Sequence, residues 1–311
     1  MKGGTVNMNK NKYQGVIPAF YACYDAEGKV SREGSKKLAR HLVGKGVKGL
    51  YVGGSSGECI YQEKEERMEI LEAVMEEVKG ECTVIAHVAC NNTAESRELA
   101  AHAERLGVDA IASIPPIYFH LPEYAIAQYW NDISAAAPNT DFIIYNIPQL
   151  AGVTLTPSLF REMRKNPRVI GVKNSSMPTY DIEIFLREGG EDCVVFNGPD
   201  EQFVAGRSIG ACGGIGGTYA VMPELFLAMD RLIRSGETEK AVPIQHEVNA
   251  IIEQMCSCRG NLYAVMKEIL RLNEGLELGS VRPPMPGLIP EDLPKAAAAA
   301  KRIREAIARF A

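Results

Sequence analysis

Lys173 is the residue whose place in the sequence most strongly suggests covalent chemistry. It follows a run of apolar, largely β-branched residues at 169–172, a pattern typical of a buried strand. Burial disfavours the charged ammonium form and lowers the pKa of a lysine, so the amine can attack a carbonyl near neutral pH and form a Schiff base. A lysine that leaves the strand for solvent is the commoner arrangement. The residues at the other strand ends must therefore decide between a catalytic and a solvent-exposed lysine.

A phenol and a glycine-rich turn follow two other apolar runs. Tyr145 lies near the end of the run 142–146 and would bring its hydroxyl to the same end of a parallel sheet as the lysine. The sequence Gly-Gly-Ser-Ser-Gly-Glu at 53–58 places Ser55 and Ser56 in a turn whose backbone amides and hydroxyls can bind an anion. Taken alone, these segments also fit a buried tyrosine with a satisfied hydroxyl and an ordinary Gly/Ser turn.

Carboxylates and glycines mark two further strand ends. Asp200 and Glu201 follow a Gly-Pro pair and offer acceptors for sugar hydroxyls, although acidic residues are equally expected in the first turn of a helix. The run 212–218, which contains Ile215, is too rich in glycine for an ordinary strand and would let a ligand approach the backbone. A lysine, a phenol, an anion-binding turn and a carboxylate pair at one edge of a sheet together describe a Schiff-base lyase.

The elements that must position these residues alternate along the first two-thirds of the chain. Apolar runs alternate with amphipathic helical segments, which predicts βα units and a parallel sheet. Eight repeats close naturally into a barrel, whereas a doubly wound sheet usually has fewer strands and a phosphate-binding glycine loop after the first. We therefore expect an α/β fold of the (β/α)8 TIM-barrel type, with strands at 16–21, 49–53, 83–88, 110–114, 142–146, 169–173, 194–197 and 211–215, and helices such as 36–45, 64–79 and 94–106.

The last part of the chain has a different pattern. Residues 223–311 are predicted to be helical, with interruptions at Gly236, at Gly260 and in the proline-rich stretch 281–286. We expect a catalytic barrel over residues 1–222 and a C-terminal helical region over residues 223–311 that packs on the barrel.

Composition excludes several classes of protein. A net charge of -5 over 311 residues provides no basic field for nucleic acid or for an anionic membrane surface. No apolar stretch approaches the ~20 residues of a membrane span. Eight cysteines without regular spacing, in a chain whose first residues lack an apolar signal region, favour reduced thiols in the cytoplasm.

Other candidate sites have simpler explanations. His87, on the third expected strand, fits a hydrogen-bonded core residue better than a catalytic base. Cys256 and Cys258 have the wrong spacing for a Cys-x-x-Cys motif, and His246 lacks the second histidine of a zinc-protease helix. We therefore expect no metal site.

Two rival functional classes make different demands on the sequence. A nicotinamide-dependent oxidoreductase requires a Gly-x-Gly-x-x-Gly turn after an early strand, which residues 53–57 do not supply. A protein that only binds a 2-oxo acid would not need Lys173 and Tyr145 together. An enzyme is therefore favoured.

Four segments resemble signatures of the N-acetylneuraminate lyase and dihydrodipicolinate synthase family. They are Gly-Gly-Ser-Ser-Gly-Glu at 53–58, Tyr-Asn-Ile-Pro at 145–148, Gly-Val-Lys at 171–173 and Gly-Gly-Ile-Gly at 213–216. The likeness runs from Tyr13 to about Pro290. It implies a (β/α)8 barrel with C-terminal helices, usually a homotetramer built as a dimer of dimers, and pyruvate bound covalently to Lys173 without metal or other cofactor.

The resemblance also implies roles for individual residues. Tyr145 would move a proton to and from the C4 oxygen of the substrate, and it needs help because a free phenol is far too basic at pH 7. Ser56 is expected to relay that proton and, with Ser55 and backbone amides, to hold the pyruvate carboxylate. Tyr118 resembles a family tyrosine that reaches into the neighbouring subunit's site, and the alternative is an aromatic residue on the barrel rim.

The residues around the second half of the substrate favour a sugar acid. In dihydrodipicolinate synthases an arginine follows Tyr-Asn-x-Pro and binds the carboxylate of the aldehyde, but this chain has Leu150 there, which cannot bind a carboxylate. The segment with Gly198, Asp200 and Glu201 resembles the one that holds the polyol tail in sialic acid lyases, and Ser175 and Ser176 after the lysine resemble the hydroxyl pair of those enzymes.

One position departs from the sialic acid lyase pattern. Gly217 stands after Gly-Gly-Ile-Gly where those lyases carry a serine, which removes one contact near Ile215 for the sugar tail. The expected reaction is the reversible cleavage of N-acetylneuraminate, or a related sugar acid, to N-acetylmannosamine and pyruvate. The alternatives are a dihydrodipicolinate synthase and another pyruvate-dependent aldolase of 2-keto-3-deoxy sugar acids.

Overall fold

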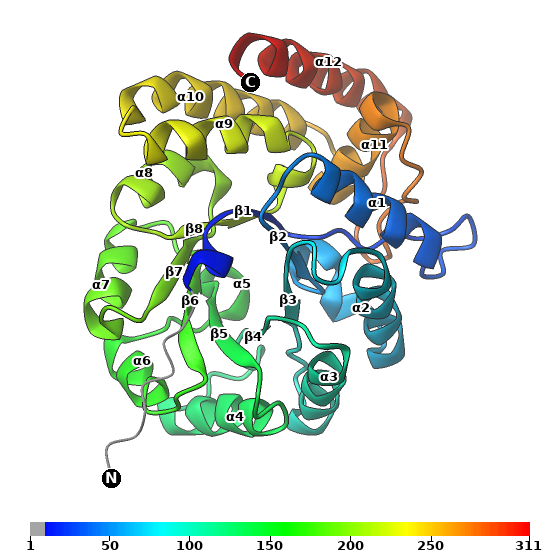
Figure 1. Ribbon diagram of the computed structural model, residues 1–311. Helices are drawn as coiled ribbons and strands as arrows, with labels where there is room; N and C mark the ends of the chain where they lie inside the picture. Colours follow the sequence, from blue (N-terminus) through cyan, green and yellow to red (C-terminus); the bar gives the residue numbers. More distant parts are fainter. Residues whose placement is uncertain (1–9) are drawn as a thin grey trace.

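Eight parallel strands form one sheet that closes into a barrel with helices around it (Figure 1). The computed structural model describes residues 10–311. The sheet order is β1-β8-β7-β6-β5-β4-β3-β2, and a parallel bridge between Ala19 and Tyr51 joins the first strand to the second. All eight predicted strands are confirmed: β1 (Gly15–Pro18), β2 (Gly49–Val52), β3 (Thr83–His87), β4 (Ala110–Ser113), β5 (Asp141–Asn146), β6 (Val169–Asn174), β7 (Val194–Asn197) and β8 (Gly213–Gly216).

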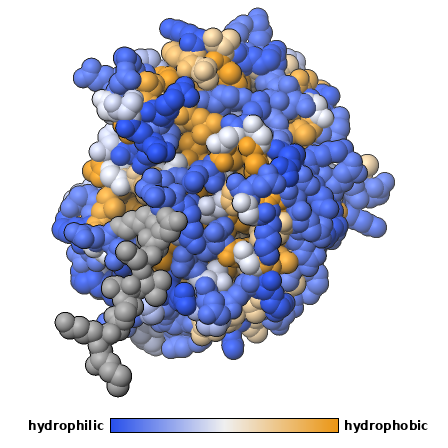
Figure 2. Space-filling model, in the orientation of Figure 1, coloured by the Kyte–Doolittle hydropathy of each residue, from blue (hydrophilic) through white to orange (hydrophobic). Residues whose placement is uncertain are grey.

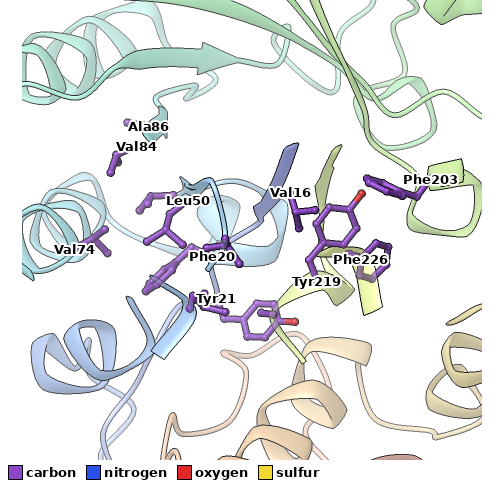
Figure 3. Close-up of a cluster of buried hydrophobic side chains, with 14 of the residues drawn as sticks. Val16, Phe20, Tyr21, Leu50, Val74, Val84, Ala86, Phe203, Tyr219 and Phe226 are labelled. Carbon is purple, nitrogen blue, oxygen red and sulfur yellow. The ribbon is translucent and has the colours of Figure 1, made fainter. Parts of the chain in front are cut away.

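Alternate residues along the strands face the two sides of the barrel wall, as the period of a strand requires. Ile17, Ile85 and Ile143 belong to the apolar cluster inside the barrel. Leu50 and Val84 face outward and share a second, larger cluster with helical residues, part of which Figure 3 shows. Because side chains fill the interior, the barrel is a packed core, and a binding site must lie at one of its ends.

Tyr13 closes the amino-terminal end of the barrel. It is the last residue of the 3-10 helix η1 (Lys10–Tyr13). The ring is completely buried, and its hydroxyl donates to the backbone oxygen of Asp109 at 2.8 Å and to the Asp141 carboxylate at 2.7 Å. The binding site is therefore expected at the opposite end of the barrel, where the strands finish.

The helices cover the outside of the sheet, and three of them confirm the predicted segments with small shifts at their ends. The two ends of helix α3 are set by its capping residues. The Asn92 side chain accepts a hydrogen bond from the backbone N–H of Glu95 at the start, and Gly107 ends the helix with a positive φ of 81°. The helices between strands are α1 (Arg32–Gly44), α2 (Lys64–Val78), α3 (Thr93–Leu106), α4 (Glu123–Ala135), α5 (Pro148–Ala151), α6 (Pro157–Met163), α7 (Tyr180–Gly189) and α8 (Phe203–Ser208).

The predicted helical character of the last part of the chain is confirmed. It contains α9 (Pro223–Arg234), α10 (Thr238–Cys256), α11 (Leu262–Glu274) and α12 (Leu293–Phe310). Helix α9 packs on β1, α8 and α10, and α12 packs on α9, α10 and α11, so this region lies along one side of the barrel (Figure 1). In Figure 3, Tyr219 and Phe226 stack where this region meets the barrel, with ring centres 3.9 Å apart.

Hydrophilic residues predominate on the face of the molecule in Figure 2, with hydrophobic ones visible between them. Among residues 10–311, none of the helices combines the length and hydrophobicity of a membrane span. All eight cysteines are free thiols. The first residues, where we predict no signal region, lie outside the described part of the chain.

Candidate active site

Lys173 and Tyr145 lie side by side at the C-terminal end of the barrel. The register of β5 and β6 pairs them directly, so both side chains point to the same side of the sheet. The Lys173 Nζ atom is 3.8 Å from the centre of the Tyr145 ring and 4.3 Å from the centre of the Tyr51 ring. The lysine is only 4% exposed, so the predicted burial of this amine is confirmed.

Burial changes the pKa values of Lys173 and Tyr145 in opposite directions. Desolvation lowers the pKa of Lys173 to about 7, while the nearby Asp200 carboxylate and Cys59 thiol oppose this shift. Desolvation raises the pKa of Tyr145 to about 12, and hydrogen bonds with the Ser55 and Ser175 hydroxyls oppose this rise. The amine is thus uncharged in a large fraction of molecules at neutral pH, while the phenol keeps its proton.

The glycine-rich turn follows β2 and includes the 3-10 helix η2 (Ser55–Gly57). Its two serines face different partners. The Ser55 hydroxyl lies close enough to the Tyr145 phenol to oppose the rise in its pKa, whereas the Ser56 hydroxyl donates to the Tyr263 hydroxyl at 3.4 Å. The proton relay through Ser56 therefore stays a prediction, and Ser55 is a second candidate for that role. Successive side chains of a tight turn point in different directions, and the sequence alone did not distinguish them.

Asp200 lies in the 3-10 helix η4 (Asp200–Gln202) beside the end of β8, and it is 7% exposed. Its Oδ2 accepts from the Thr218 backbone at 2.7 Å, while Oδ1 has no hydrogen-bond partner among the described residues. A Cβ at Gly216 would fall 1.9 Å from that oxygen, so the absence of a side chain there makes room for the carboxylate. Desolvation raises the pKa of Asp200 to about 7, and Lys173 opposes the shift.

Ser175 and Gly198 form a second close contact on the same side of the site. A Cβ at Gly198 would lie 2.0 Å from the Ser175 hydroxyl, so glycine is required for this approach. The adjacent Ser176 is directed elsewhere, since its hydroxyl donates to Asp181 at 2.6 Å. Of these two serines, Ser175 is the one whose hydroxyl opposes the rise in the pKa of Tyr145.

Several residues singled out from the sequence contribute no buried polar group to this cluster. Glu201 is exposed, and Ile215 is completely buried in the apolar interior, so its side chain offers no polar contact. Leu150 is 65% exposed on α5. Tyr118 is 86% exposed, has a positive φ of 81° and packs edge to face on Phe119, so it does not enter the site of its own chain.

The structure adds aromatic residues that the sequence did not reveal. Tyr263 comes from α11 and lies beside Gly217, where a Cβ would be 3.2 Å from the Ser56 hydroxyl and 3.8 Å from the Tyr263 ring. Tyr51 packs edge to face on Tyr145 with ring centres 5.8 Å apart. No strand-end pattern pointed to Tyr263, because a helix of the C-terminal region delivers it.

His87 is buried beside the same aromatic residues. Its Nδ1 lies 2.9 Å from the Gly53 oxygen, and burial together with the Arg67 guanidinium lowers its pKa well below the usual value. The prediction of a hydrogen-bonded core residue is confirmed. Among residues 10–311, no group of three or more histidine, cysteine or acidic side chains has a geometry that could hold a metal ion.

Comparisons with known proteins place the chain in one family. The model of the dihydrodipicolinate synthetase family matches residues 12–303. An N-acetylneuraminate lyase of Mediterraneibacter gnavus is 64% identical over 302 residues, which is 97% of this chain and 96% of the relative. A catalytic lysine mutant of the Ruminococcus gnavus sialic acid aldolase superposes with a TM-score of 0.97 at 64% identity, covering 97% of this chain and 99% of that one. The Clostridium difficile protein CdNal, solved with mannosamine, has a TM-score of 0.86 at 30% identity, with 96% and 99% covered.

Proposed function

Because the chain belongs to the dihydrodipicolinate synthetase family, we propose that it cleaves N-acetylneuraminate reversibly to N-acetylmannosamine and pyruvate through an imine on Lys173. The observation that carries this proposal is the buried amine, with a pKa of about 7, next to the Tyr145 phenol. No external cofactor is needed, since the imine itself serves as the electron sink.

Lys173 is the nucleophile. Its neutral amine adds to the C2 ketone of the open-chain sugar acid, and loss of water leaves a protonated imine. The low pKa caused by burial keeps enough amine uncharged for this attack at neutral pH.

Tyr145 is the acid-base residue. In cleavage the C4 hydroxyl gives its proton to Tyr145, which acts at this step as the phenolate, the C3–C4 bond breaks, and its electron pair moves toward the imine to form an enamine. Protonation at C3 and hydrolysis then release pyruvate and regenerate the amine. In the synthetic direction the phenol protonates the aldehyde oxygen. Ser55 supports the proton transfer, because its hydrogen bond opposes the rise in pKa that burial imposes on Tyr145.

The two ends of the substrate occupy different groups of residues. Ser55, Ser56 and the backbone amides of their turn bind the pyruvate carboxylate. Ser175, Gly198, Asp200, Glu201 and Gly217, with the backbone at Ile215, surround the sugar tail. Asp200 has an unpaired oxygen that a sugar hydroxyl can satisfy, which supports this assignment.

We also propose a homotetramer, a dimer of dimers, in which Tyr118 completes the site of a neighbouring subunit. Its exposure of 86% and that of Phe119, 71%, support burial of this rim at a subunit interface. The eight free cysteines favour a cytoplasmic location. We also propose that the chain divides into a barrel at 1–222 and a helical region at 223–311.

Borohydride trapping tests the central step. The protein is incubated with pyruvate, reduced with borohydride and analysed by intact mass and peptide mapping. One reduced pyruvate is expected on the peptide that contains Lys173, and Lys173→Ala should abolish both adduct and turnover. An adduct on another lysine, or none, would overturn the proposed mechanism.

A substrate panel tests the choice of sugar. Cleavage of N-acetylneuraminate should exceed that of 2-keto-3-deoxy sugar acids, and condensation of pyruvate with aspartate semialdehyde should be negligible because Leu150 offers no partner for a carboxylate. Robust condensation with the semialdehyde and no cleavage of any sialic acid would favour the synthase instead.

A further inference from the structure

We propose that the buried ion pair between Lys267 and Glu58 is a positioning device, through which the C-terminal helices set the geometry of the Ser55–Ser56 turn. The inference rests on the proposed function, which assigns the pyruvate carboxylate to that turn. It concerns two residues that touch neither pyruvate nor the sugar, so both are positioning residues.

Every polar atom of the Glu58 side chain is used within the protein. Its Oε1 lies 2.9 Å from the Lys267 Nζ atom, and its Oε2 accepts from the Tyr24 hydroxyl at 3.1 Å and from the Arg282 backbone at 2.8 Å. The Glu58 side chain is fully buried and that of Lys267 is 2% exposed. An ion pair with no access to water keeps its geometry more strictly than a solvated one, because a broken contact leaves a buried charge without a partner.

Lys267 carries the contact into the C-terminal region. It belongs to α11, and its ammonium also donates to the Ser280 backbone oxygen at 2.7 Å. The Arg282 guanidinium then bonds to the Glu66 carboxylate on α2, at 2.8 Å for Nη2. The segment 280–282 therefore contacts α11 through Ser280 and the barrel helix α2 through Arg282.

Glu58 directly follows the serines that the ion pair is inferred to position. Its backbone N–H donates to the Ser55 oxygen at 3.0 Å, and its φ of 57° is a left-handed conformation that residues other than glycine seldom adopt. Such a conformation persists only where the surroundings hold it, and here the side-chain contacts of Glu58 do so. Rotation at Glu58 would move the amides and hydroxyls of the turn relative to Lys173.

A second buried ion pair provides a matched control. Arg207 on α8 and Asp230 on α9 are 2.7 Å apart, with side chains 10% and 9% exposed. Asp230 lies near Gly15, at the start of β1, which is the end of the barrel opposite to the serine turn. Loss of either pair should destabilise the fold, but only the pair at Glu58 adjoins the pyruvate carboxylate.

The experiment compares Lys267→Met with Arg207→Met. Both variants should melt at lower temperatures than the parent. In Lys267→Met the pyruvate concentration that gives half-maximal borohydride trapping should rise roughly 10- to 100-fold, the scale of a small displacement of binding groups. The KM for N-acetylmannosamine in the synthetic direction should stay unchanged, and Arg207→Met should alter neither quantity.

If Lys267→Met does not fold, the double variant Glu58→Gln/Lys267→Met serves, because it leaves no unpaired buried charge. A folded variant at Lys267 with the pyruvate dependence of the parent would overturn the inference, as would an equal change in Arg207→Met. A parent protein that forms no imine would instead contradict the proposed function.

Discussion

Lys173 and Asp200 each oppose the pKa shift that burial imposes on the other. Desolvation lowers the pKa of the amine to about 7 and raises that of the carboxyl group to about 7, and the attraction between their charged forms acts against both changes. The two groups therefore titrate in the same range of pH, so the protonation state of one depends on the other.

Imine formation should depend on pH through this pair. The neutral amine is the nucleophile, so the initial rate of borohydride trapping with pyruvate should rise as the pH increases through about 7. Asp200→Asn removes the charge that raises the lysine pKa, so the rise should move to lower pH. Glu191→Gln, at an exposed position before β7, is the control and should leave the profile in place. An unshifted profile in Asp200→Asn would mean that the Asp200 charge does not affect the pKa of Lys173, which would contradict the prediction.

Tyr145→Phe should keep the ring packing and remove the acid-base group. We expect kcat for cleavage to fall by roughly 100-fold or more, the scale of general acid-base catalysis, while pyruvate still forms its imine, although more slowly. Tyr51→Phe is the matched control, since that ring also lies against Lys173 but its hydroxyl has no hydrogen-bond partner among residues 10–311. Turnover close to that of the parent in Tyr145→Phe would remove this residue from the mechanism.

Ser55→Ala and Ser56→Ala should have different effects. Loss of the Ser55 hydroxyl removes a hydrogen bond that lowers the pKa of Tyr145, so kcat should fall and any basic limb of the pH–rate profile should move to higher pH. Ser56 contacts Tyr263 instead, so Ser56→Ala should chiefly raise the KM for pyruvate. Steady-state kinetics over a range of pH distinguish these outcomes, and a larger fall in kcat for Ser56→Ala would support Ser56 as the proton relay.

Asp200→Ala should weaken binding of the sugar end. A hydrogen bond to a charged buried group contributes about 1.5–3 kcal/mol, so kcat/KM for N-acetylneuraminate should fall roughly 10- to 100-fold. Glu201→Ala should have a smaller effect, because its side chain is exposed. Pyruvate trapping in the pH range where the amine of both proteins is neutral provides the internal reference. Equal losses for the sugar acid and for pyruvate would mean that Asp200 does not discriminate between the two ends.

Gly217→Ser tests whether a missing hydroxyl limits the use of N-acetylneuraminate. The new Cβ would lie 3.2 Å from the Ser56 hydroxyl, a tight approach that a small rotation of that serine can relieve. If the hydroxyl is the only defect, kcat/KM for N-acetylneuraminate should improve. Unchanged kinetics across a panel of sialic acids would indicate a natural substrate with a shorter or differently configured tail.

The sequence by itself determined the barrel and its two central residues. Eight apolar runs separated by helical segments specify parallel strands, and the carboxyl ends of such strands must meet at one edge. A lysine and a tyrosine near the ends of two successive strands are therefore brought together by the topology alone, and the register of β5 and β6 pairs them. Their approximate surroundings follow from strand periodicity, which decides the side of the sheet on which each residue lies.

The tertiary structure decided which neighbours complete the site. The Ser55 hydroxyl affects the pKa of Tyr145 while that of Ser56 donates to Tyr263, because the rotation of a tight turn depends on the contacts that hold it and not on its composition. Tyr263 and Lys267 enter from α11, and Lys267 pairs with a glutamate 209 residues away in the chain. Contacts over such separations arise only when a helix packs against the barrel, and the periodicity that predicts the helix does not specify its partner.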